Sequence, residues 1–131
     1  MTTLFDDEVA ARTIYQEARG EGQSGMAAVA HVIRNRIVDG RWGKCAASVC
    51  LWRAQFSGWS SSDPNFQIAC ELDEGDGLLG QCAQIWGESG SDDDPTDGAC
   101  FYFSTVIAPP AWANAMIFTV QIGKHRFYRD K

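Results

Sequence analysis

The sequence predicts an α+β fold, with several helices first and a small antiparallel sheet last. Apolar residues recur at helical spacings in the first 40 positions, whereas aromatic and β-branched residues dominate the last third, in "ACFYF" and "IFTVQIGKHRFYR". With 131 residues and 45% apolar content, the chain has the size of one ordinary domain. We therefore expect residues 1–131 to form a single domain.

The first predicted helix ends in an unusual place for a carboxylate. Asp6 or Asp7 can cap its start and Gly20 is placed to end it, so that Glu17 falls in its last turn. The negative end of the helix dipole disfavours an ionised carboxylate there. Glu17 could be an ordinary solvated side chain at a helix end, or a general acid.

The second predicted helix begins near Ser24 and runs to Asp39 and Gly40. His31 lies off its apolar stripe, so we expect this histidine to be partly exposed. The stripe itself consists of Met26, Val29, Ala30, Ile33 and Ile37.

The segment from Arg41 to Asn65 is predicted to be an irregular loop because it is dense in Gly, Ser and Pro. Long loops in compact domains usually have a function. Its aromatic and amide residues are of types that stack on sugars or hydrogen-bond to them. These residues are Trp52, Gln55, Phe56 and Trp59. Alternatively, Trp52 and Phe56 anchor the loop in the core.

The next predicted helix follows Pro64, and a further one begins near Leu78. The acidic run "DDDPTDG" after it is expected to be a solvated turn. It is a poor match to a calcium loop, because Asp97 stands where the sixth-position glycine belongs.

The last segment predicts a hairpin. Gly123-Lys124 suits a two-residue turn with glycine first. The resulting register pairs Ile122 with His125, Val120 with Phe127 and Phe118 with Arg129, and it directs His125 inward or toward a groove.

Composition excludes several classes of function. Seventeen acidic and eleven basic side chains give a net charge of −6, which argues against nucleic acid as a partner. No apolar run is long enough to cross a membrane. Two histidines and no CxxC motif offer no good metal-ligand set, so we expect no metal. Five cysteines leave at least one unpaired.

Five segments stand in order along the chain: "YQEARGEGQSGMAAVAHVIRNRI", "QFSGW", "DPTDGACFYF", "PPAW" and "IGKHRFY". They resemble cell wall hydrolases of the spore-cortex-lytic (SleB/CwlJ) type over nearly the whole chain. The resemblance implies a lysozyme-like catalytic domain that cleaves the glycan strand of peptidoglycan, often as a lytic transglycosylase. We expect the protein to be a monomer and to need no cofactor.

The resemblance also implies site residues. The first glutamate of the family's "EARGE" segment is the catalytic acid, and here that residue is Glu17. We expect His125 to support the fold or orient a group rather than carry protons. As a group, the residues expected to bind substrate are Gln55, Phe56, Ser57, Trp59, Thr96, Tyr102 and His125.

Glycoside chemistry narrows the reaction. The leaving oxygen needs a proton near neutral pH, so one carboxyl must be protonated there. A hydrolytic muramidase also needs a second carboxylate, for which Glu21 is a candidate unless it pairs with Arg19 or caps the next helix. A lytic transglycosylase needs none, because the muramoyl 6-hydroxyl attacks internally, and this is the interpretation that we favour. The muramidase, an N-acetylmuramoyl-L-alanine amidase and a non-catalytic glycan-binding module stay open as alternatives.

The opening "MTTLFDDEVAART" lacks the basic start and apolar run of a secretion signal. We therefore expect either a spore enzyme or a bacteriophage endolysin that stays in the cytoplasm until it is released to act on the bacterial wall.

Overall fold

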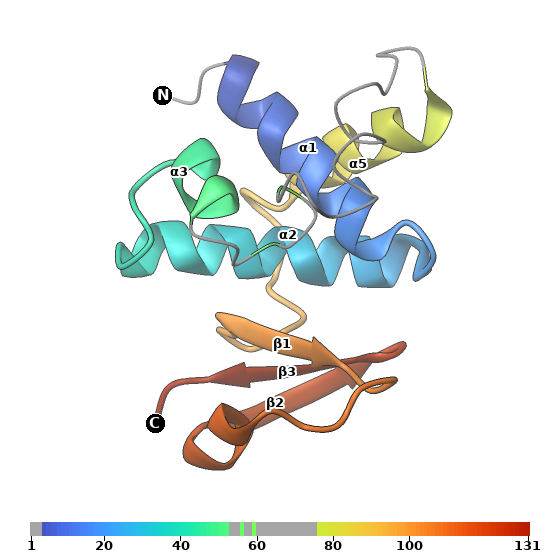
Figure 1. The fold of residues 1–131 in the computed structure, drawn as a ribbon. Coiled ribbons are helices and arrows are strands. Elements are labelled where there is room, and N and C mark those ends of the chain that lie inside the picture. Colours follow the sequence, from blue (N-terminus) through green and yellow to red (C-terminus); the bar gives the residue numbers. More distant parts are fainter. Residues whose placement is uncertain (1–3, 53–55, 57–58, 60–75) are drawn as a thin grey trace.

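The computed structural model describes residues 4–52, 56, 59 and 76–131, and it has the α+β order that the sequence predicts. The helices are α1 (Leu4–Ala18), α2 (Gly22–Asp39), α3 (Ala46–Leu51) and α5 (Gly77–Glu88), and the strands are β1 (Phe101–Ser104), β2 (Ile117–Ile122) and β3 (His125–Arg129). A short 3₁₀ helix, η2 (Ala111–Ala115), precedes β2. Figure 1 shows α2 in the middle, with α1, α3 and α5 on one side and the sheet on the other. Among the described residues, no helix is long and apolar enough to span a membrane.

The N-terminal aspartates join helices rather than cap α1. The helix begins at Leu4, before both expected caps. Asp6 Oδ1 accepts a hydrogen bond of 3.0 Å from the backbone N–H of Ala47, at the start of α3. Asp7 Oδ1 accepts one of 2.9 Å from the indole Nε1 of Trp86 in α5. These bonds hold α1 against both of its neighbours.

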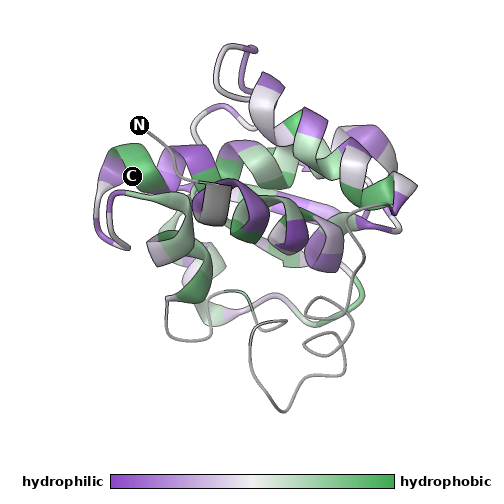
Figure 2. Ribbon diagram, turned by 90° about the horizontal axis from the view of Figure 1, so that it is seen from above, coloured by the Kyte–Doolittle hydropathy of each residue, from purple (hydrophilic) through white to green (hydrophobic). Residues whose placement is uncertain are grey.

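Helix α2 separates two apolar cores. The larger core lies between α1, α2, α3 and α5, and the smaller one lies between α2 and the sheet. Seen from above, the helices carry hydrophobic residues alongside hydrophilic ones, as amphipathic packing requires (Figure 2). Because α2 is covered on two sides, His31 is only 5% exposed, with its Nδ1 3.8 Å from Asp94 Oδ1. The prediction of a partly exposed His31 was wrong.

The segment between α2 and α5 contains a helix that the sequence pattern did not predict. Helix α3 buries Ala46, Val49 and Cys50, which are spaced as one helical face. The helix expected after Pro64 lies outside the described residues. Helix α5 starts close to the expected position, capped by Asp76, whose carboxylate accepts from the N–H groups of Leu78 and Leu79 at 3.0 Å.

The acidic run after α5 is not simply a solvated turn. Asp94 Oδ1 accepts hydrogen bonds from the backbone N–H and hydroxyl of Thr96, and Oδ2 accepts from Gly98 N and Asn35 Nδ2, all at 2.7–2.8 Å. Asp94 therefore organises the turn and ties it to α2, while Asp92 and Asp93 are exposed as expected.

The sheet has the strand order β1-β3-β2, with both neighbouring pairs antiparallel. The hairpin turn and the pairs Ile122 with His125 and Val120 with Phe127 are confirmed. The predicted pairing of Phe118 with Arg129 was wrong, because Phe118 pairs with Tyr128. The register shifts between Phe118 and Val120, where β2 carries one extra residue as a β-bulge.

Candidate active site

Two side chains far apart in the sequence meet at the end of α1. Glu17 lies half-buried in the last turn of this helix, as predicted. The hydroxyl of Tyr102, on β1, donates a hydrogen bond to Glu17 Oε1 across 85 positions of sequence. The contact therefore joins the helical part of the molecule to the sheet.

Tyr102 is held as a permanent donor. Burial raises the pKa of its phenol well above the ordinary value, and the nearby Glu17 carboxylate raises it further. A phenol whose pKa is raised keeps its proton at neutral pH. The Tyr102 hydroxyl can thus orient Glu17 but will not deprotonate to compete with it.

His125 packs beside this pair from the start of β3. Its ring centroid lies 5.0 Å from that of Tyr102, and Phe127 lies 5.3 Å from Tyr102 on the same sheet face. Burial lowers the pKa of His125 below 6.5, and the nearby carboxylate of Glu21 opposes that shift. The imidazole is therefore neutral at neutral pH.

The side chain of Glu21 does not cap the next helix, which was one of the roles expected for it. It occupies the N-cap position of α2, but its side chain makes no capping hydrogen bond there. Its Oε1 accepts a hydrogen bond of 2.8 Å from the backbone N–H of Lys124, in the hairpin turn. Glu21 is thus turned toward the hairpin.

The other expected site residues divide into three groups. Phe56 is 2% exposed and lies in the larger core, as the core-anchor alternative states, whereas Trp52 is 40% exposed. Trp59 packs against that core and donates from Nε1 to Thr13 Oγ1 at 2.7 Å. Thr96 is fully buried and bonds within the turn that Asp94 organises. The remaining two, Gln55 and Ser57, lie outside the described residues.

Arg36 is a neighbour of the candidate site that was not among the predicted site residues. The guanidinium is buried in a ring-lined space, 4.7 Å from the Trp42 ring and 5.1 Å from that of Phe56, and Nε donates to the Cys100 carbonyl at 2.7 Å. Burial lowers the pKa of Arg36, while Tyr102 and, more weakly, Glu17 oppose that shift. The sequence did contain a signal that Arg36 is buried. It stands seven residues after Val29 and therefore lies on the apolar stripe of α2.

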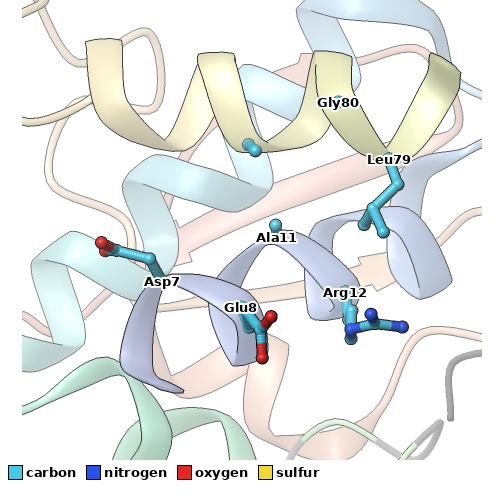
Figure 3. A pocket seen from close by; sticks show the side chains of 7 residues that line it. Asp7, Glu8, Ala11, Arg12, Leu79 and Gly80 are labelled. Atoms are coloured by element: carbon cyan, nitrogen blue, oxygen red, sulfur yellow. The ribbon is translucent and has the colours of Figure 1, made fainter. Parts of the chain in front are cut away.

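A small groove lies elsewhere, between α1 and α5. It has a volume of about 180 Å³ and includes Asp7, Glu8, Arg12 and Leu79 in its lining (Figure 3). None of the expected site residues lines it. In the part of the chain that the structure describes, no three His, Cys, Asp or Glu side chains are grouped as ligands for a metal ion.

Two solved structures share the fold of this chain. The catalytic domain of the germination-specific lytic transglycosylase SleB from Bacillus anthracis is 26% identical, with a TM-score of 0.79 over 97% of this chain and 96% of that one. The catalytic domain of the Bacillus cereus SleB protein, 24% identical, has a TM-score of 0.80 over 98% of this chain and 93% of that one, so it shares the fold.

The fold is therefore lysozyme-like, as expected. No curated protein sequence matched the chain. The family described as Cell Wall Hydrolase matches residues 20–128, which include Glu21, Tyr102 and His125 and begin just after Glu17. The chain therefore belongs to the cell wall hydrolase family.

Proposed function

We propose that this chain is a catalytic domain that cleaves the MurNAc-GlcNAc glycan strand of peptidoglycan as a lytic transglycosylase, with Glu17 as its acid and base. One observation carries the proposal: Tyr102 donates to a Glu17 carboxyl at a helix end, in a fold shared with a lytic transglycosylase domain. A hydrogen bond from a phenol that keeps its proton fixes the rotamer of that carboxyl.

In the proposed reaction, Glu17 Oε2 carries the proton while Tyr102 holds Oε1. The proton passes to the glycosidic oxygen as the bond from the muramoyl C1 to that oxygen breaks. The muramoyl 6-hydroxyl then attacks C1, and its proton returns to the Glu17 carboxylate. The products are a new GlcNAc end and a 1,6-anhydromuramoyl end, and the enzyme regains its initial protonation state.

The position of Glu21 supports the transglycosylase over the hydrolytic muramidase. A hydrolytic enzyme would use a second carboxylate on the sugar. Glu21 instead accepts a backbone hydrogen bond from the hairpin turn. We therefore assign the acid and base roles to Glu17 and not to Glu21.

The decisive experiment is Glu17→Gln, which keeps the side-chain shape and removes the transferable proton. Lysis of purified cell walls should fall by roughly 10²–10⁴-fold while the melting temperature stays close to that of the wild type. Glu88→Gln, at an exposed carboxylate of α5, serves as the matched control and should lyse walls normally.

Mass spectrometry of the wild-type digest distinguishes the alternatives. Anhydromuramoyl ends are expected, because they report internal attack. Reducing muramic ends would indicate a hydrolytic muramidase, and freed peptides on an intact glycan would indicate an amidase. Binding to walls without any cleavage would indicate a glycan-binding module.

A further inference from the structure

The carboxylate of Glu21 links two parts of the molecule that the proposed site needs to hold together. It projects from the junction of α1 and α2, and its Oε1 accepts the 2.8 Å hydrogen bond from Lys124 N in the β2–β3 turn. The Glu21 side chain is 14% exposed, and the hydrogen bond itself lies at the surface of the hairpin turn. The contact spans 103 positions of sequence.

Two glycines, Gly25 and Gly123, lie in close contact with the Glu21 side chain. A Cβ atom on Gly25, one turn into α2, would overlap the Cβ of Glu21. A Cβ atom on Gly123 would lie 2.8 Å from Glu21 Oε1, and Gly123 also has a φ of +58°, which favours glycine. The stem of the Glu21 side chain thus lies close to Gly25, and its carboxylate lies close to Gly123.

The residue after Lys124 carries this contact to the proposed site. His125 Nδ1 lies 3.9 Å from Glu21 Oε1, and it is buried without a hydrogen-bond partner among the described residues. The His125 ring packs on Tyr102, and Tyr102 donates to Glu17. Turns at hairpin tips are otherwise mobile.

We propose that Glu21 is a positioning residue that latches the hairpin turn onto the start of α2 and so holds His125 and Tyr102 in place to orient Glu17. This inference rests on the proposed function of Glu17. In this role the acceptor oxygen of Glu21 matters, and its negative charge does not. A glutamine, which has the same shape and the same acceptor, should therefore preserve the latch.

The test compares Glu21→Ala, Glu21→Gln and the exposed control Glu88→Ala in the whole chain. Glu21→Ala should lower kcat for glycan cleavage by roughly 10–100-fold, because small misplacements of a catalytic group are costly, while KM changes little. Glu21→Gln should recover most of that loss, and Glu88→Ala should match the wild type.

Amide hydrogen exchange gives a readout that does not depend on activity. The Lys124 amide should lose its protection in Glu21→Ala and keep it in Glu21→Gln. The Tyr102 ring resonances should shift in the alanine variant only. If Glu21→Ala does not fold, Gly123→Ala disturbs the same contact from the hairpin side and should give the same pattern.

If the wild type is active, three results would overturn the proposed role of Glu21. The first is unchanged protection of Lys124 in Glu21→Ala, and the second is lost protection with normal kcat. The third is a Glu21→Gln variant that keeps protection yet is as inactive as Glu21→Ala, which would assign Glu21 a charge-dependent role. If the wild type cleaves no glycan, the proposed function fails, and unchanged Tyr102 resonances in Glu21→Ala would then overturn the latch separately.

Discussion

Tyr102 shows how one side chain can serve both packing and chemistry. Its ring packs against Phe127 and His125 on the sheet face, and its hydroxyl reaches the end of α1. Burial and the Glu17 carboxylate keep the phenol protonated by raising its pKa. In the proposed mechanism, the hydroxyl would therefore hold Glu17 throughout the catalytic cycle.

Replacing Tyr102 by phenylalanine should separate these two roles. Tyr102→Phe keeps the ring and removes the donor, so wall lysis should fall by about 10–100-fold, equivalent to one charge-assisted hydrogen bond of about 1.5–3 kcal/mol. Lysis rates and thermal melts of the same preparation would measure both effects. Tyr128→Phe is the matched control, because the Tyr128 hydroxyl accepts from Arg126 instead. Equal losses of activity in the two variants would contradict a specific role for Tyr102.

At the scale of elements, α2 is the helix on which the rest of the fold depends. It packs against α1, α3 and α5 on one side and against the sheet on the other. Its first turn contains Gly25, at a position where alanine would normally be the better helix former. The close approach of Glu21 explains why a glycine stands there.

Gly25→Ala should therefore destabilise the protein. The gain of up to about 1 kcal/mol in helix propensity is outweighed by an overpacking cost of about 1–3 kcal/mol, since the obstacle is a Cβ next to the backbone. Gly80→Ala in α5 is the control, because nothing lies within 4 Å of the added methyl group. It should stabilise the fold. The urea unfolding midpoint should therefore fall in Gly25→Ala and rise in Gly80→Ala. A shift in the same direction for both variants would refute this prediction.

The whole molecule should lose stability in acid, in two steps. The pKa of His125 is lowered by burial, with opposition from Glu21, so stability is full above pH 6.5 and falls as pH drops through the folded pKa. The pKa of Asp94 lies below 3.8, because hydrogen bonds from Thr96, Asn35 and Gly98 outweigh the opposite effect of burial. Its contribution is full above pH 3.8 and is lost below it.

Unfolding midpoints in urea between about pH 7.5 and pH 3 would follow both steps. His125→Asn should remove the upper step and leave the lower one. A wild-type protein that becomes more stable as the pH falls from 7 to 5 would contradict this account.

Thiol reactivity should report global unfolding. The four described cysteines are free, and only Cys45 is exposed. Burial raises the pKa of Cys50 to about 12, and of Cys82 and Cys100 to about 11. Because the thiolate is the reactive form, iodoacetamide should label Cys45 in the native protein and the other three only after unfolding. Peptide mapping before and after denaturation measures this labelling. Rapid labelling of Cys82 or Cys100 in the native protein would contradict their burial.

Local patterns in the sequence determined much of this protein. The spacing of apolar residues predicted α2, and glycine in the turn predicted the hairpin and its first two pairs, Ile122 with His125 and Val120 with Phe127. The motif segments indicated the cell wall hydrolase family. Each of these signals depends on residues that are close together in the sequence, within one or two helical turns or across one tight turn. Such a signal can therefore be recognised without knowing the tertiary contacts.

The tertiary structure alone decided which distant groups meet. The bond from Tyr102 to Glu17 and the bond from Lys124 to Glu21 connect residues 85 and 103 positions apart. The burial of His31 follows from α2 being covered on two sides, and the bulge in β2 moved Phe118 to Tyr128. The periodicity of the sequence does not predict such contacts, because they depend on how the helices and the sheet pack together. In addition, one extra residue in a strand changes every residue pair beyond it.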